Sequence, residues 1–293
     1  MTASYRYRVG SIGCIAVADG TFPYTSEMLF ANAPIEAAEQ ALRERGLDPN
    51  AIPIHYIALL IQSEAHRVLV DTGLGSGVTP SAGQLLNNLR AAGIAPGTID
   101  TVILTHGHPD HIGGNLSDDG KPAFPNARYV MAKTEWDFWT ADSTLEQCAA
   151  GRIFGLGELD RLTGAWARKN LPPVRGQADL VEGEAEIVPG VRVIPAGGHT
   201  PGHLAVLVSS GNSQLLHIAD TVLHPIHLER PEWRPVFDLD PDRAAATGRR
   251  LLDRAAADKT PVMAYHFPFP GLGRVTASAT GWTWEAAEGG TAV

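Results

Sequence analysis

The stretch Thr105-His106-Gly107-His108-Pro109-Asp110-His111, followed by Ile112-Gly113-Gly114, gathers metal-ligating side chains directly after an apolar segment, residues 101–105. The branched side chains of that segment predict a short strand. His106 and His108 leave the strand end as alternate residues and can turn their imidazoles onto one ion, while Asp110 and His111 face a neighbouring position. Imidazole and carboxylate ligands suit zinc, and the absence of cysteine keeps iron, manganese and cobalt compatible. The stretch therefore predicts part of a metal centre.

Further ligands have to come from elsewhere in the chain, because four side chains cannot complete two metal sites. Three candidates follow apolar, strand-like runs: His199 in the segment Gly-Gly-His-Thr-Pro-Gly-His, Asp220 after residues 215–219, and His266 after residues 261–265. Each ligand group thus lies just beyond a predicted strand, which is where sites are usually built on a rigid scaffold.

Short β-rich runs alternate with helical patterns along the rest of the chain. Strands are predicted at residues 9–18, 54–62, 67–71, 128–131, 187–195, 204–209 and 214–218. Helices are predicted at residues 33–45, 81–92, 154–169 and 242–257, and in a segment that carries Trp136 and Trp139 as core residues. No break in composition divides the chain, so residues 1–293 are expected to form a single domain.

Composition and charge narrow the class of protein. Apolar residues make up 44% of the chain and charged residues 19%, which is ordinary for a globular protein with a sizeable core. The net charge of -9 argues against nucleic acid as a partner. Cys14 and Cys148 form no disulfide framework, and the chain shows neither an apolar leader nor an apolar stretch of about 20 residues. We therefore expect a cytoplasmic protein that acts on a small molecule, without a membrane partner.

Taken together, these motifs resemble the metallo-β-lactamase superfamily. The matching segments are Asp71-Thr72-Gly73, the HGHPDH segment, and the segments around His199, Asp220 and His266, in the order expected of the family. They cover most of the chain, from residue 55 to residue 270 in round numbers. The resemblance implies an α+β fold, an αββα sandwich of two mixed β-sheets flanked by helices, with the metal site along one edge of the two sheets.

The resemblance also assigns the ligands. It implies that one metal is held by His106, His108 and His199, that a second is held by Asp110, His111 and His266, and that Asp220 bridges them. All of these positions carry the expected residue type, which favours two divalent metal ions, with zinc as the expected pair. A water shared by two such cations has a lowered pKa, so a metal-bridging hydroxide is the expected nucleophile. Asp110 is expected to orient that nucleophile or pass a proton to the leaving group, so Asp110 and Asp220 are the catalytic candidates.

Other polar residues near the motifs allow two interpretations. Asp71 either accepts a hydrogen bond from a ligand imidazole or stabilises its own Asp-Thr-Gly turn. His203 is interpreted as a structural residue or a support for a ligand, and not as an eighth ligand. His224 and His227 are interpreted as ordinary histidines, although their position soon after Asp220 leaves a role at the site open.

The sequence His-Phe-Pro-Phe-Pro-Gly-Leu-Gly at residues 266–273, together with residues 231–241, resembles one branch of this superfamily. That branch contains methyl parathion hydrolase and related lactonases and arylesterases. The resemblance implies hydrolysis of lactones, of aryl or carboxyl esters, or of organophosphate triesters, and is compatible with a homodimer. Phe267 and Phe269 are predicted to line an apolar substrate pocket, with core packing as the alternative, and Phe22 and Tyr24 are weaker candidates.

Other activities remain as alternatives. A mononuclear iron-dependent oxygenase acting on a thiol or persulfide also occurs on this fold, but His266 argues against it because it completes a second ligand set. A nuclease of the superfamily would need a basic face, and none is visible in the sequence. The sequence contains no GxSxG motif, so a serine hydrolase would lack its nucleophile.

Overall fold

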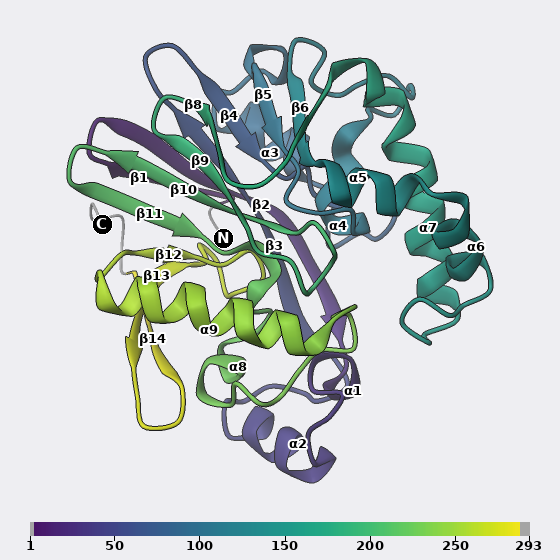
Figure 1. Ribbon diagram of the computed structural model, residues 1–293, viewed down its shortest axis with the longest axis vertical. Helices are drawn as coiled ribbons and strands as arrows, with labels where there is room; N and C mark the ends of the chain where they lie inside the picture. Colours follow the sequence, from purple (N-terminus) through teal and green to yellow (C-terminus); the bar gives the residue numbers. More distant parts are fainter. Residues whose placement is uncertain (1–2, 288–293) are drawn as a thin grey trace.

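Residues 3–287, described by a computed structural model, form two seven-stranded β-sheets with helices on their outer faces (Figure 1). The first sheet consists, in spatial order, of β1 (Ser4–Val9), β2 (Ile12–Tyr24), β3 (Ile52–Gln62), β4 (Arg67–Val70), β5 (Thr101–Ile103), β6 (Arg128–Ala132) and β7 (Ala178–Val181). Its pairs are antiparallel from β1 to β4 and parallel from β4 to β7.

The second sheet is also mixed. It consists of β14 (Trp282–Ala286), β13 (Leu272–Ala277), β12 (Val262–Met263), β11 (Ser213–His217), β10 (Leu204–Ser210), β9 (Val191–Pro195) and β8 (Ala185–Val188). Strands β11 and β12 are parallel, and the other neighbours are antiparallel. The expected pair of mixed sheets is therefore confirmed.

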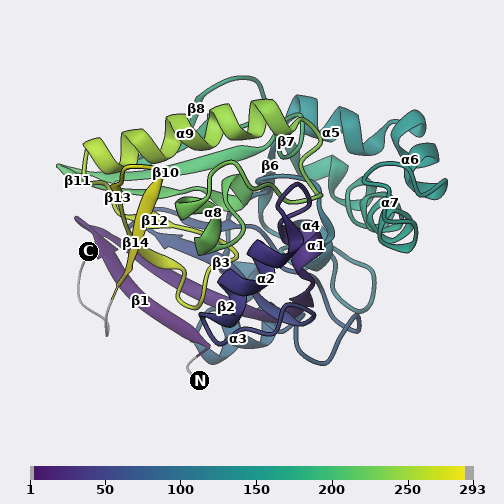
Figure 2. The same ribbon diagram turned by 90° about the horizontal axis from the view of Figure 1, so that it is seen from below.

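Helices complete the layers on both sides. The described α-helices are α1 (Ser26–Leu29), α2 (Ile35–Arg43), α3 (Leu85–Ala91), α4 (Pro109–Ile112), α5 (Lys133–Thr140), α6 (Asp142–Ala149), α7 (Glu158–Asn170), α8 (Pro225–Glu229) and α9 (Pro241–Ala257). Figure 2 shows α9 along the outer face of the second sheet and α3 along the outer face of the first. The αββα sandwich expected from the sequence is confirmed. None of the helices within residues 3–287 is long and apolar enough to cross a membrane.

Alternating side chains explain why both faces of a strand can be buried. In β10, Leu204, Val206 and Val208 pack between the sheets, while Ala205 and Leu207 pack toward α9. Because both faces meet apolar neighbours, the strand appears in the sequence as one continuous apolar run.

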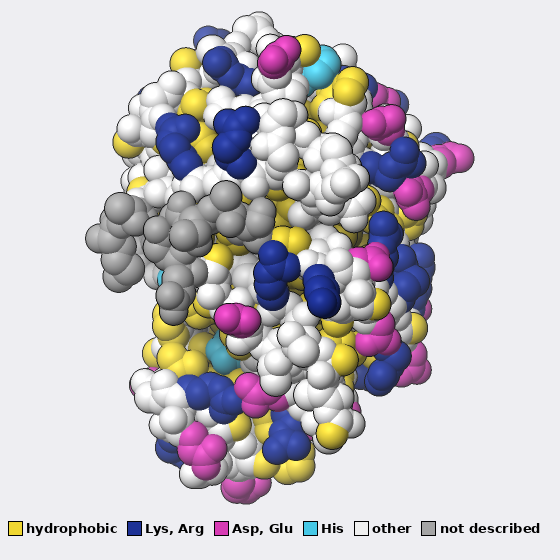
Figure 3. Space-filling model, turned by 90° about the vertical axis from the view of Figure 1, so that its left-hand side faces the viewer, with side chains coloured by type: hydrophobic (Ala, Val, Ile, Leu, Met, Phe, Trp, Pro, Cys, Tyr) yellow, Lys and Arg dark blue, Asp and Glu magenta, His cyan; other side chains and the backbone are white. Residues whose placement is uncertain are grey.

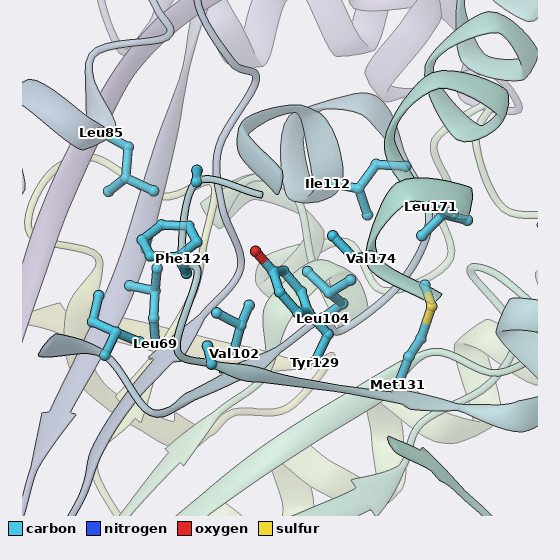
Figure 4. Close-up of a cluster of buried hydrophobic side chains, with 14 of the residues drawn as sticks. Leu69, Leu85, Val102, Leu104, Ile112, Phe124, Tyr129, Met131, Leu171 and Val174 are labelled. Atoms are coloured by element: carbon cyan, nitrogen blue, oxygen red, sulfur yellow. The ribbon is translucent and has the colours of Figure 1, made fainter. Parts of the chain in front are cut away.

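The strands of the first sheet follow the same rule. Tyr129 and Met131 of β6 point toward the helix-covered side, where they lie among the side chains of Figure 4, including Leu171 and Val174. Val130 points the other way, into the layer between the sheets.

Two predicted strands each cross a turn in the structure. The strand expected over residues 9–18 contains the end of β1 and the start of β2, which are joined at residues 10–11. The strand expected over residues 187–195 is two strands, β8 and β9, joined by a tight turn. Gly190 has a φ of 82° in this turn, a conformation that favours glycine. An apolar run can continue through such a turn, so periodicity alone did not separate the two strands.

The strand order explains where the predicted ligands meet. β4 and β5 are parallel neighbours in the first sheet, and β11 and β12 are parallel neighbours in the second. The carboxyl ends of parallel strands lie at the same edge of a sheet, so Asp71 lies beside the 105–111 segment and Asp220 beside His266.

Charges are mixed on the face of the molecule drawn in Figure 3. Lys and Arg side chains there are separated by acidic and apolar groups, and the described residues on this face form no continuous basic surface.

Candidate metal centre

The structure brings the predicted ligands together in two adjoining groups at this edge of the sheets. Within each group the candidate ligand atoms lie within 4.8 Å of one another, and every side chain is buried. One group consists of His106, His108, His199 and Asp220; the other consists of Asp110, His111 and His266. The predicted set is therefore assembled in space, from loops that follow β5, β9, β11 and β12.

Asp220 lies between the two groups. Its Oδ2 is 3.4 Å from His199 Nε2 and 2.9 Å from His266 Nε2. Its Oδ1 is 3.1 Å from His111 Nε2. Burial raises the pKa of Asp220, but the surrounding histidines outweigh it and hold that pKa well below its usual range. A charged carboxylate that contacts imidazoles of both groups is positioned as a bridging ligand requires.

Unpartnered buried atoms show that these side chains fit cations. The Nε2 atoms of His106 and His111 and the Oδ1 atom of Asp220 are buried without a hydrogen-bond partner. The Nε2 atom of His108 is also buried without a partner, and its Nδ1 lies 3.0 Å from His199 Nε2. Burial holds the pKa values of His106 and His108 well below their ordinary value, so both rings are neutral and offer lone pairs. Such costly unpaired groups are satisfied when a cation lies between them.

Asp71 contacts a candidate ligand and a strand end at the same time. His111 Nδ1 lies 2.8 Å from Asp71 Oδ2, and the backbone N–H and hydroxyl of Thr105 donate to the same carboxylate at 2.7 and 2.8 Å. A carboxylate on Nδ1 leaves Nε2 of His111 free to face a metal. The structure therefore shows the contact between Asp71 and the imidazole of a candidate ligand, which was one of the two interpretations of Asp71.

His203 supports the loop that carries Asp220. Its Nδ1 lies 3.0 Å from the carbonyl of Ala196, and its Nε2 accepts a hydrogen bond from the backbone N–H of Asp220 at 3.1 Å. Burial lowers its pKa to about 3, so the ring is neutral, as both hydrogen bonds require. With both nitrogens engaged, His203 is not positioned as an eighth ligand.

His224 and His227 lie outside both ligand groups. They cap α8 reciprocally, since His224 Nδ1 accepts from the backbone N–H of Ile226 and His227 Nδ1 accepts from that of His224. His227 Nε2 lies 2.8 Å from the carbonyl of Leu29, which ties α8 to α1. Their contacts therefore stabilise the local structure.

Two carboxylates that the sequence analysis did not single out support the candidate ligands. Asp238 Oδ1 lies 2.8 Å from His199 Nδ1. Glu135 is fully buried and accepts hydrogen bonds from the backbone N–H groups of Gly107 at 3.0 Å and Gly202 at 2.7 Å. Glu135 thereby joins the two ligand loops. The position of Glu135 beside Trp136, on a helix with a buried face, could have indicated that this carboxylate is buried. No spacing or motif in the sequence indicated a role for Asp238.

An Asp238→Ala variant is expected to bind metal about 10- to 100-fold more weakly, because a ligand imidazole loses the partner that orients it. Chelator competition on the purified protein measures this affinity. Asp242→Ala is the matched control, since Asp242 is a carboxylate whose side chain is 95% exposed. Equal affinity of the two variants would contradict a supporting role for Asp238.

An apolar pocket opens onto both ligand groups. Its walls come from α7, from the loop after β4 and from the ends of β2 and β3. His108, Asp110, His199, Asp220 and His266 lie at its base. The walls carry Phe22, Tyr24, Met28, Tyr56, Leu74, Phe154, Leu159, Trp166, Leu223 and Phe237, among others. Within residues 3–287 the two exposed large apolar side chains, Val78 and Leu162, also line it.

The prediction that Phe267 and Phe269 line this pocket was wrong. Phe267 is fully buried in the layer under α9, with its ring 4.9 Å from that of Trp284. Phe269 packs against the layer between the sheets. β12 ends at Met263, so the alternation of a strand does not extend to these residues. Phe22 and Tyr24, the weaker candidates, do line the pocket.

Comparison with known proteins gives the family. Residues 57–266 match the model of the metallo-β-lactamase superfamily. The chain belongs to this superfamily.

Several relatives are lactonases. The chain is 23% identical over 221 residues to the N-acyl homoserine lactonase AiiA of Bacillus thuringiensis subsp. kurstaki, covering 68% of this chain and 76% of that protein. It is 27% identical over 194 residues to a probable metallo-hydrolase of Mycobacterium tuberculosis, covering 57% of this chain and 56% of the relative.

Solved structures agree over nearly the whole length. AidC, a dizinc quorum-quenching lactonase in complex with a product, superimposes with a TM-score of 0.87 at 25% identity and 99% coverage of both chains. The hydrolase AbOPH superimposes with a TM-score of 0.89 at 26% identity, again with 99% coverage of both chains. Together with the two ligand groups, these relatives make the chain a metal-dependent hydrolase and do not favour the iron oxygenase alternative.

Proposed function

We propose that this chain is a two-metal lactonase that opens lactones carrying an apolar acyl group. The observation that supports it is the apolar pocket whose base consists of residues from both ligand groups. A substrate whose apolar part fills such a pocket has its polar, reactive part beside the metal ligands. The lactonase relatives support the same reaction class.

Different residues of the chain are assigned to metal binding and to proton transfer. Two divalent cations would supply a water of lowered pKa and polarise the carbonyl of the substrate. We assign one cation to His106, His108 and His199, the other to Asp110, His111 and His266, and the bridging position to Asp220. Asp110 also lines the pocket, where its carboxylate can orient the attacking water and return a proton to the leaving alcohol. Its backbone is held in place by the hydroxyl of Tyr265, which donates to the Asp110 carbonyl at 2.5 Å.

Zinc is the proposed metal. The ligand atoms are imidazole nitrogens and carboxylate oxygens, a set that zinc accepts readily. AidC, with the same fold, is a dizinc enzyme. Iron, manganese and cobalt have compatible ligand preferences, so metal analysis of the purified protein decides among them.

Aryl esters and phosphotriesters form a second substrate class. Aromatic rings pack well against an aryl leaving group. The pocket is lined by six aromatic side chains: Phe22, Tyr24, Tyr56, Phe154, Trp166 and Phe237. The same nucleophile attacks a polarised carbonyl or phosphoryl centre.

The direct test is turnover by the metal-loaded protein on lactones, aryl esters and phosphotriesters that share an apolar substituent. We expect the highest kcat/KM on lactones, about two bound metals per chain, and loss of activity after chelation that is restored by zinc. A protein that binds two metals but opens no lactone would overturn the lactonase assignment. One bound iron with oxygen uptake would overturn the hydrolase as well.

A Phe22→Ala variant is expected to raise KM for a lactone with a long acyl chain by about tenfold, since part of the 1.5–3 kcal/mol gained on burying a phenyl group is lost. A lactone with a short chain should change little, because it reaches less of the wall. Phe269→Ala is the matched control, since Phe269 lies outside the pocket. Steady-state kinetics on both lactones measures the effect, and a similar KM change in both variants would count against this wall as the acyl site.

A further inference from the structure

Two tyrosines of the pocket form a pair beside the candidate metal ligands. Tyr24 ends β2 and Tyr56 lies on the neighbouring β3, and both line the pocket. Their hydroxyl oxygens are 3.3 Å apart. The ring of Tyr56 packs edge-on against that of His266, with centroids 5.5 Å apart. The carbonyl of His55, next to Tyr56 in the strand, lies 2.9 Å from His266 Nδ1. One strand thus positions both a candidate ligand and a phenol.

Counting donors shows that one phenolic proton is available. Two hydroxyl groups carry two protons, and a hydrogen bond between them uses one. Tyr56 is 3% exposed and is the more enclosed of the two, whereas Tyr24 is only partly buried. If Tyr56 donates to Tyr24, the proton of Tyr24 is free to point into the pocket. The pocket also exposes Asp110 and Asp220 to the same space.

Burial of both phenols disfavours their charged forms. Burial raises the pKa of Tyr24 well above its ordinary value, and the carboxylates of Asp110 and Asp220 raise it further. Burial likewise raises the pKa of Tyr56. The pair is therefore described as two neutral hydroxyl groups that share one hydrogen bond and line the pocket.

We propose that Tyr56 donates a hydrogen bond to Tyr24, and that Tyr24 donates one to the leaving-group oxygen of the substrate. This inference rests on the proposed ester or lactone hydrolysis. When the carbon–oxygen bond breaks, its electron pair moves to that oxygen, and the Tyr24 hydroxyl stabilises the charge while keeping its own proton. The proton that completes the alcohol comes from the attacking water by way of Asp110. Tyr24 is then a catalytic residue, and Tyr56 is a positioning residue.

The test varies the leaving group at a constant acyl group. For Tyr24→Phe we expect kcat to fall about 100-fold on a lactone or ethyl ester, as when one donor to a developing oxyanion is removed, and by less than about threefold on a 4-nitrophenyl ester. The reason is that 4-nitrophenolate carries its charge without help, whereas an alkoxide does not. Tyr56→Phe should give a smaller loss, about tenfold, with the same dependence on the leaving group.

Tyr7→Phe is the matched control. Tyr7 is buried between the sheets, and its hydroxyl contacts the sulfur of Met263 and lies outside the pocket. Removing its hydroxyl should change kcat only slightly, and by the same factor for every ester. A loss in Tyr24→Phe that is equal across leaving groups would show a structural effect and overturn the proposal, and so would no loss on lactones.

A binding measurement gives a second readout. Calorimetric titration of metal-loaded protein with N-hexanoyl-L-homoserine and with its analogue that lacks the side-chain hydroxyl compares the alcohol oxygen directly. We expect wild-type protein to prefer the hydroxyl compound about tenfold and Tyr24→Phe to lose this preference. An unchanged preference in the variant would overturn the proposal. Absence of lactone and ester turnover in wild-type protein would instead refute the proposed function.

Discussion

An Asp220→Ala variant is expected to lose at least about 10³-fold in kcat, because it removes the carboxylate that faces both groups of candidate ligands. His111, His199 and His266 each have a nitrogen within 3.4 Å of this carboxylate and would lose a common negative partner. The cation assigned to Asp110, His111 and His266 should be lost first, since only two imidazoles and one carboxylate would remain to hold it. Turnover and metal content of the same preparation measure both effects.

The fold of this variant should persist. The bond from the Asp220 backbone N–H to His203 does not depend on the side chain and continues to hold the loop. Asp119→Ala provides the control, since the Asp119 side chain is 56% exposed and pairs with Lys121 on the surface. Turnover by Asp220→Ala close to that of this control would refute the two-metal assignment.

A Glu135→Ala variant is expected to lower the free energy of unfolding by about 3–5 kcal/mol, since three buried donors would lose their acceptor at about 1–3 kcal/mol each. The donors are the backbone N–H groups of Gly107 and Gly202 and the indole of Trp139. Burial raises the pKa of Glu135, and these hydrogen bonds offset part of that cost. Because Glu135 joins the two loops that carry the histidines, metal affinity should fall as well.

Denaturant unfolding of the metal-free protein separates these two effects. Glu135→Gln should lose less stability, because the amide keeps one acceptor oxygen but places an NH₂ group against a donor. Glu158→Ala tests the loss of an exposed carboxylate, since its side chain is 75% exposed, and should change stability by less than about 1 kcal/mol. If Glu135→Ala were as stable as Glu158→Ala, the carboxylate would have no structural role in joining the loops.

Local sequence was sufficient to predict which side chains are candidate ligands, because each of them comes directly after an apolar strand. The turn at Pro109 and the short spacing of the HGHPDH segment constrain where four side chains can point. The two-layer arrangement could also be predicted from the sequence. Both faces of strands such as β10 are buried, so these strands appear in the sequence as apolar runs.

Contacts between segments that are distant in the sequence could not be predicted. Asp238 lies 39 residues from His199, and their contact depends on how the loop before α9 folds back. Phe267 adjoins a candidate ligand in the sequence but packs against Trp284 of β14, because the chain leaves β12 after Met263. Once a strand has ended, a residue that adjoins a candidate ligand in the sequence does not have to point its side chain toward the same site.

The sequence by itself determined the kind of chemistry: the residue types, their positions at strand ends, and a family that binds two metals. Only the tertiary structure decided which side chains surround that chemistry. It placed the pocket between α7 and the ends of β2 and β3, left the predicted Phe267 and Phe269 outside its lining, and paired Tyr24 with Tyr56 across neighbouring strands. The physical reason is that ligand identity is a local property of a motif, whereas a pocket wall is made where segments remote in sequence pack together.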